Sequence, residues 1–284
     1  MIAPNTDTMA VQRTRMRALI IPREHGAWGL LLVPLLTGMA AGITSADQIW
    51  PSLMFSVAAL SLFWLRTPVQ SLLGTGSLRA STSREWQTSL LLSLFLVAVS
   101  AACLMELMWN GRNRELLVMG VIAALAFAAQ SVFRKFGRRL RMAAQLVGAI
   151  GLTCTAPASY YISSGHLDRR AIILWTATWV FAGNQIHFVQ LRIHSAHAVG
   201  FPEKFSQGKA FFLAQPLLLA ILVFGSFRRF IPPLVIIAFI PVLARGMRWF
   251  FQAPEKLDIK SVGWSEMKQG AIFGVLLAIA FILS

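Results

Sequence analysis

The sequence predicts an all-α protein, a polytopic transmembrane helix bundle of about nine spans. Of its 284 residues, 56% are hydrophobic and only 13% are charged, whereas a soluble globular chain carries roughly 25% charged residues. Apolar runs of about 20 residues, each long enough to cross ~30 Å of hydrocarbon, recur from Gly26 to the last residue. Lys and Arg also concentrate in alternate connections, as expected for successive membrane crossings.

The predicted spans follow one another with short polar connections. They lie near residues 26–43, 49–65, 88–109, 116–133, 142–163, 171–191, 210–227, 231–244 and 269–284. Arg66 and Pro68 are expected to end the second span, because proline lacks the amide hydrogen that continues a helix. The eighth run is short enough for a tilted or re-entrant segment. A basic cytoplasmic N-terminal arm, residues 1–22, thus precedes a single transmembrane helical domain, residues 23–284.

The basic residues predict the orientation of these spans. With the N-terminus in the cytoplasm, 20 of the 26 Lys and Arg residues fall in inner segments and six in outer ones. The positive-inside rule therefore predicts a cytoplasmic N-terminus and a C-terminus outside. The net charge of +15 needs no nucleic-acid partner, because basic residues on the cytoplasmic face also attract the anionic lipids of the bilayer.

Polar groups gather at the inner helix ends, where each is a functional-site candidate because its desolvation requires a partner. The richest stretch is "FAGNQIHFVQLRIHSAH", residues 181–197. At about 100° per residue, one helical stripe roughly 140° wide holds Asn184, His187, Gln190, His194 and His197. Gln185 and Arg192 share another face. We interpret the stripe as a polar wall for an anionic or quinone-like headgroup; the alternative is a set of interfacial residues that bond to neighbouring helices or lipid.

No metal site is predicted in this stretch. His194 and His197 are three residues apart and could share one ion, but no carboxylate or cysteine lies near them in sequence to complete a coordination shell. The two cysteines, Cys103 and Cys154, form no disulfide or metal-binding motif either.

The first span opens with "REHGAWGLLLVPLLTG", residues 23–38, where a charge pair and a histidine precede apolar residues. Arg23, Glu24 and His25 are predicted to face the same inner cavity as the stripe. The alternative is that Glu24 caps the positive end of the helix or pairs with Arg23. Between spans four and five, Gln145 follows a basic cluster, and Gly148 with Gly151 forms a face for close helix packing. The candidate ligand-binding residues are Arg23, Glu24, His25, Arg66, Gln145, Asn184, His187, Gln190, Arg192 and His194.

Three segments, "IPREHGAWGLLLVPLLTG", "FAGNQIHFVQLRIH" and "GAIGLTCTAPASYY", resemble the bacterial YwiC-like integral membrane proteins over most of the chain. This resemblance implies a multi-pass location in the bacterial cytoplasmic (inner) membrane and brings no established activity. "REHGAWGLLLVP" and "VFRKFGRR" more distantly resemble the UbiA-type intramembrane prenyltransferases, which implies nine spans, an N-in orientation and a cytoplasm-facing cavity. That family holds Mg²⁺ with aspartate clusters after spans two and six. In this sequence the acidic residues of those two connections are Glu85 and Glu203, each alone, and there is no aspartate. The sequence therefore does not support a Mg²⁺ site.

These observations predict an integral membrane protein of uncharacterised function with a cytoplasm-facing polar cavity. Its expected partners are the lipid bilayer and an amphipathic ligand that is anionic or isoprenoid/quinone-like. One alternative is a divergent prenyltransferase that lacks the aspartate-rich motifs, with His187 or His25 as general base. Another is a small-anion transporter, although the outer half offers almost nothing polar apart from Glu106. A third is haem binding between His25 and His187. The cofactor, the catalytic residues and any reaction stay open.

Overall fold

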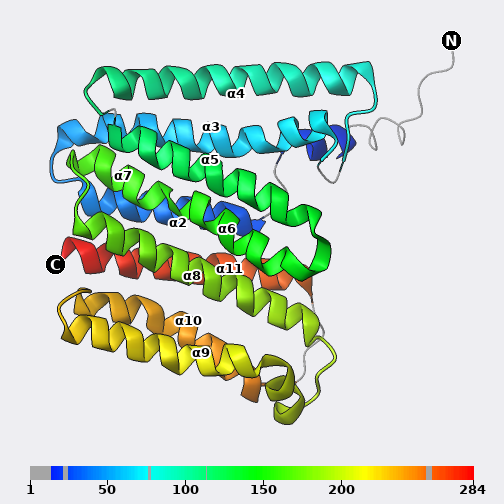
Figure 1. Cartoon of the computed structure of the whole chain (residues 1–284), viewed down its shortest axis with the longest axis vertical. Coiled ribbons are helices and arrows are strands. Elements are labelled where there is room, and N and C mark those ends of the chain that lie inside the picture. The colour runs from blue at the N-terminus through cyan, green and yellow to red at the C-terminus, as the bar shows by residue number, and fades with distance from the viewer. Residues whose placement is uncertain (1–13, 22–24, 76–77, 113, 254–257) are drawn as a thin grey trace. The chain divides into compact units, whose positions relative to one another are not determined.

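The computed structural model describes residues 14–21, 25–75, 78–112, 114–253 and 258–284, and these form helices without a strand (Figure 1). In chain order they are α2 (His25–Gly42), η1 (Ala46–Gln48), α3 (Ile49–Leu73), α4 (Ser83–Trp109), α5 (Arg114–Lys135), η2 (Gly137–Leu140), α6 (Arg141–Thr153), α7 (Thr155–Ser164), α8 (Arg169–His194), α9 (Phe201–Phe227), α10 (Pro233–Phe251) and α11 (Ile259–Ile282). The predicted all-α class is confirmed.

Most of these helices have the length and composition of membrane spans. Among the described residues, seven segments are long and apolar enough to cross a bilayer, and they correspond to α3 with η1, α4, α5, α6 with α7, α9, α10 and α11. Of the other two predicted spans, α2 is shorter and α8 carries the polar stretch. Each predicted apolar run overlaps a helical segment in this part of the chain. The protein is therefore a multi-pass membrane protein.

The prediction that the second span ends at Arg66 and Pro68 was wrong. Helix α3 continues to Leu73 with Pro68 inside it and buried. Proline removes one amide hydrogen, whereas a helix end would leave up to four carbonyl groups without partners in apolar surroundings. The Ser71 hydroxyl donates a hydrogen bond to the Pro68 carbonyl, 2.8 Å away. Continuing the helix therefore leaves fewer backbone groups unpaired than ending it.

The fifth predicted span is divided into two helices at Cys154. The cause lies in Pro157, which has no amide hydrogen to donate to the Thr153 carbonyl and whose ring would clash with that carbonyl. Helix α6 therefore ends at Thr153 and α7 begins at Thr155. The Thr155 hydroxyl donates a hydrogen bond to the Leu152 carbonyl at 2.7 Å, which gives one carbonyl group near the break a donor.

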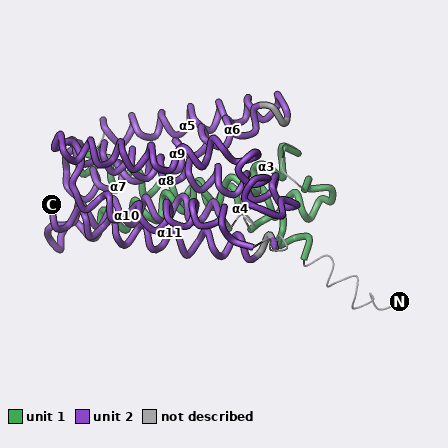
Figure 2. Tube along the Cα trace, turned by 90° about the horizontal axis from the view of Figure 1, so that it is seen from below, with its two compact units in different colours: residues 1–24, 50–113 green, residues 25–49, 114–284 purple. Residues whose placement is uncertain are grey.

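The chain divides into two compact units, coloured separately in Figure 2. Unit 1 contains residues 1–24 and 50–113, and unit 2 contains residues 25–49 and 114–284. In unit 1, residues 14–20 form a short helix, and Arg15 pairs with Glu85 at 2.6 Å. Glu85 also completes a capping box with Thr82 at the start of α4.

Unit 2 holds the remaining helices and separate clusters of buried apolar side chains. Helix α2 lies between α7 and α11, and α8 contacts α2, α6, α7 and α9. Phe181 of α8 stacks on Phe273 of α11 with 3.9 Å between ring centroids. Gly148 and Gly151 of α6 lie against α5, where an added Cβ would meet Gln130 and Ala126. The predicted small-residue packing face on α6 is thus confirmed, and α8 is placed at the centre of the unit.

Glycines also bring α2 close to α7. A Cβ at Gly38 would lie 2.1 Å from the Ala156 carbonyl oxygen, and one at Gly42 would lie 2.8 Å from the Tyr160 carbonyl oxygen. Gly38 and Gly42 are four residues apart and therefore share one face of α2, which is the G-x-x-x-G arrangement that allows two membrane helices to approach closely.

Candidate ligand-binding pocket

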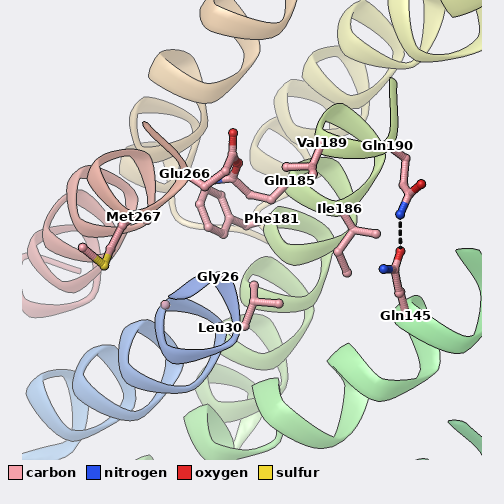
Figure 3. A pocket seen from close by; sticks show the side chains of 12 residues that line it. Gly26, Leu30, Gln145, Phe181, Gln185, Ile186, Val189, Gln190, Glu266 and Met267 are labelled. Atoms are coloured by element: carbon pink, nitrogen blue, oxygen red, sulfur yellow. Dashed lines mark hydrogen bonds between the residues drawn. The ribbon is translucent and has the colours of Figure 1, made fainter. Parts of the chain in front are cut away.

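A pocket of about 180 Å³ lies in unit 2, where α2, α6, α8 and α11 meet (Figure 3). Its apolar and small lining residues are Gly26, Gly29, Leu30, Phe181, Ile186, Val189, Met267 and Gly270. Its polar lining residues are Gln145, Gln185, Gln190 and Glu266. The pocket is therefore an apolar cavity with a few polar groups, which is the usual composition of a small-molecule site.

The pocket lies near one end of its four helices. Gln145 follows the first residue of α6 by four positions, and Gln190 precedes the last residue of α8 by four positions. At 1.5 Å per residue, both lie ~6 Å from a helix end. Gly26 is the second residue of α2. Gln145, Gln190 and Gly26 thus lie close to the ends of their helices, on the side where α2, α6 and α11 begin.

Two glutamines form one polar side of the pocket. The Gln190 Nε2 amide donates to Gln145 Oε1 at 3.0 Å, as Figure 3 shows. Each side chain has a second amide atom, and neither Gln145 Nε2 nor Gln190 Oε1 bonds to another described residue. If the oxygen and nitrogen of both amides were exchanged, the pair would still have one donor group and one acceptor without a protein partner among the described residues. This side of the pocket can therefore both donate to and accept from a ligand.

An ion pair lies at another part of the rim. Arg245 of α10 meets Glu266 of α11 through two N–H···O contacts, Nη1 to Oε1 at 2.6 Å and Nη2 to Oε2 at 3.1 Å. The Arg245 and Glu266 side chains are only 16% and 10% exposed. This bidentate interaction is strong and directional because both partners are charged and planar. The pair therefore joins α10 to α11 and neutralises two charges in apolar surroundings.

Two further groups contact the Arg245 guanidinium. Its Nη2 atom donates to Gln185 Oε1 at 2.6 Å, and its central carbon lies 4.3 Å from the Phe188 ring centroid. Its Nε atom is buried and has no hydrogen-bond partner in the described part of the chain. Gln185 and Phe188 both belong to α8, so the arginine links α8, α10 and α11.

Sequence reasoning placed Arg245 in a connection and did not identify Glu266. The eighth and ninth apolar runs were expected at 231–244 and 269–284, but α10 reaches Phe251 and α11 begins at Ile259. In the sequence, a single charged residue marks the end of an apolar run. Two opposite charges that pair with each other, however, can lie inside packed membrane helices. Glu266 precedes Gly270 and Gly274 by four and eight residues. This helical spacing was a signal that α11 starts earlier.

The predicted opening motif lies partly outside the described residues. Arg23 and Glu24 lie outside the described residues, and of His25 the structure describes only the backbone, as the first residue of α2. The next turn is described, and Gly26 and Gly29 line the pocket together with Gln190. The beginning of α2 and the end of α8 are therefore neighbours. The role of the three motif side chains stays a prediction.

The predicted stripe on α8 contacts more than one neighbour. Gln190 lines the pocket, whereas Asn184 donates from Nδ2 to Gln215 Oε1 of α9 at 2.9 Å. The His187 ring meets the Phe211 ring of α9 edge to face, with centroids 5.1 Å apart. His194 is exposed and its Nδ1 lies 2.7 Å from the Gln190 carbonyl oxygen. Asn184 and His187 thus face α9 rather than the pocket.

Two arginines remain among the predicted ligand-binding residues, Arg192 and Arg66. Arg192 is half-buried near the end of α8, and it is not among the pocket-lining residues. Arg66 lies in α3, which belongs to unit 1. No group of three or more His, Cys, Asp or Glu residues is arranged to hold a metal ion within the described ranges.

The comparison with protein families bears on the first half of this arrangement. A model of the YwiC-like protein family matches residues 21–160, just under half of the chain. This region is YwiC-like. It contains the opening motif and two walls of the pocket, α2 and α6, while α8 and α11 follow it. No curated protein and no solved structure matches the chain. The predicted resemblance to this family is confirmed over residues 21–160; the segment "FAGNQIHFVQLRIH", residues 181–194, lies beyond the match, and the UbiA-like architecture stays a prediction.

Proposed function

We propose that this membrane protein binds an amphipathic ligand of isoprenoid or quinone-like chemistry in the pocket between α2, α6, α8 and α11. The observation that carries the proposal is an apolar cavity whose polar side retains unpaired amide groups close to the helix ends, which in this proposal is the depth of the membrane interface. An amphipathic molecule in a bilayer places its polar head at that depth and its tail among apolar side chains, as aromatic and amphipathic groups of membrane proteins also do.

The head would meet the Gln145–Gln190 pair. An amide pair with one donor and one acceptor left over suits a carbonyl or hydroxyl oxygen, because these form neutral hydrogen bonds with amides. The first part of the tail would lie against Leu30, Phe181 and Ile186. Drug-sized ligands occupy pockets of roughly 300–1,000 Å³, so a cavity of about 180 Å³ accommodates a head and the start of a chain. The rest of a long tail would extend into lipid.

The described groups favour binding over Mg²⁺-dependent prenyl transfer. Mg²⁺ sites need carboxylate oxygens that are free to coordinate, and the one carboxylate of the pocket is engaged by Arg245 through both of its oxygens. The amide groups, in contrast, are available to a ligand.

Filling the cavity tests the proposal. Gly29 lines the pocket, and a Cβ built there meets no atom within 4 Å. Gly29→Leu should therefore occupy the cavity without displacing the backbone. The matched control is Gly120→Leu in α5, because a Cβ at Gly120 also meets open space and Gly120 does not line the pocket.

The measurement is binding of farnesol and of a short-chain ubiquinone analogue to the full chain in lipid nanodiscs, with native mass spectrometry of the purified protein for retained lipids. The wild type and Gly120→Leu should bind at least one probe with equal affinity, and Gly29→Leu should bind it at least tenfold more weakly. If Gly29→Leu binds as the wild type does, the ligand is not in this pocket. If no probe and no retained lipid is found, the proposed function is wrong for these chemistries.

A further inference from the structure

The two members of the buried ion pair have different positions relative to the pocket. Glu266 lines the cavity, whereas Arg245 does not and lies behind it, against Gln185 and Phe188. Figure 3 shows Glu266 and Gln185 on one side of the cavity and the Gln145–Gln190 pair on the other. A ligand head between these two sides would therefore meet amides at one end and a carboxylate at the other.

We infer that Glu266 determines the headgroup specificity of the pocket, which accepts an uncharged, hydroxyl-bearing head and excludes a phosphate or carboxylate. This inference rests on the proposed function, since it concerns the ligand of the same cavity. It names the ligand class as an isoprenoid alcohol or a hydroquinone rather than an anionic lipid.

The charge of Glu266 follows from its partner. Arginine does not lose its proton in proteins, and two N–H groups of Arg245 point at the two carboxylate oxygens. The carboxylate is thereby held ionised, and an ionised carboxylate is only an acceptor, with lone pairs left on both oxygens. A hydroxyl group of a ligand can donate to it, whereas an anionic oxygen has no proton to donate and would meet a like charge.

Among the described residues, no positively charged side chain lines the cavity. Arg245 does not line the pocket, and its Nη atoms donate to Glu266 and Gln185; Arg192 of α8 does not line the pocket either. In a site of low dielectric the group in direct contact with the ligand dominates, because charge interactions fall with distance. The polar lining groups that the described residues supply are therefore three amides and one carboxylate.

Two probes that differ only in the head test this inference: farnesol and farnesyl phosphate, which share one fifteen-carbon tail. Binding of each to the full chain in nanodiscs gives an affinity ratio. The wild type should bind farnesol at least tenfold more tightly than farnesyl phosphate. Glu266→Gln keeps the size of the side chain and an oxygen for Arg245, but exposes the arginine charge, so the ratio should shift at least tenfold toward the phosphate.

The matched control is Glu106→Gln, because Glu106 is exposed on α4 and outside unit 2; its affinity ratio should equal that of the wild type. A second variant removes both charges, Glu266→Gln with Arg245→Met. Replacing a whole buried ion pair is often tolerated where breaking it is not, and this double variant should lose the discrimination against phosphate at least severalfold.

The outcomes separate the two claims. If neither probe binds the wild type and Gly29→Leu has no effect on any ligand, the proposed function fails and the inference with it. If both probes bind but the ratio is the same in the wild type, Glu266→Gln and the double variant, the pocket binds ligands and Glu266 does not select them. A wild type that prefers farnesyl phosphate overturns the inference directly.

Discussion

Replacing Gly38 with alanine should force α2 and α7 apart. The Cβ of alanine would lie 2.1 Å from the Ala156 carbonyl oxygen and 2.2 Å from the Ser159 hydroxyl oxygen. Ordinary van der Waals contact begins near 3.4 Å, so the shortfall at the carbonyl is about 1.3 Å on the scale of normal contact distances. The serine hydroxyl can rotate away, but the carbonyl belongs to the backbone of α7 and cannot. The two helices must therefore separate along their contact.

The cost can be estimated from two opposing effects. Overpacking a close contact costs ~1–3 kcal/mol, and the fixed carbonyl places Gly38→Ala in the upper part of that range. Alanine is favoured over glycine inside a helix by about 1 kcal/mol. We expect a net loss of about 1–2 kcal/mol in the free energy of unfolding. The control Gly120→Ala meets open space and should gain up to about 1 kcal/mol from helix propensity alone.

Unfolding by sodium dodecyl sulfate from mixed dodecyl maltoside micelles provides the assay, because the nine tryptophans of the chain report the transition by fluorescence. The two variants should differ by about 2–3 kcal/mol, with Gly38→Ala the less stable. Equal unfolding free energies for Gly38→Ala and Gly120→Ala would refute the argument, since they would mean that α2 and α7 are not in close contact at Gly38.

Two further predictions concern other parts of the chain. Lys204 is buried and donates to the carbonyl oxygens of Trp249, at 3.2 Å, and Gln252, at 2.8 Å; Lys204→Met should lower the unfolding free energy by about 2 kcal/mol because these carbonyls lose a charged donor. An unchanged value in the same assay would contradict this role. The N-in orientation predicts that a membrane-impermeant maleimide labels Asn110→Cys in intact cells and Phe136→Cys only after lysis, at two exposed positions. Cys103 and Cys154 are buried and should give little background, and the reverse pattern would overturn the orientation.

The helices could be predicted because the bilayer imposes a length on each apolar run. Each of the nine runs overlaps a helical segment among the described residues, and the errors occur where a local rule competes with the membrane environment. Pro68 ends a helix in water but continues one where the exposed carbonyls would have no partner. Pro157 divides a run that hydropathy treats as continuous, because its missing amide hydrogen leaves the Thr153 carbonyl without a donor.

The site was predicted less completely, for a different reason. Gln145 and Gln190 were identified as polar residues near inner helix ends, and both line the pocket. Arg245 and Glu266 are 21 residues apart on different helices, and each alone resembles a loop residue. Only their pairing makes them compatible with packed helices, and pairing is a property of the tertiary structure. The division of the α8 stripe between α6 and α9 also depends on neighbours that periodicity does not reveal.

The contact between α2 and α11 has a consequence for biosynthesis. Val33 of α2 packs near Gly270 and Gly274 of α11 (the blue and red helices in Figure 1). These partners are separated by most of the chain, and a ribosome adds ~5–20 residues per second. After Gly42 is made, some 240 residues separate it from Ile282, so α2 waits on the order of 10–50 s for its partner. Glu266, Met267 and Gly270 of α11 line the cavity, so the cavity is complete only when synthesis has passed α11.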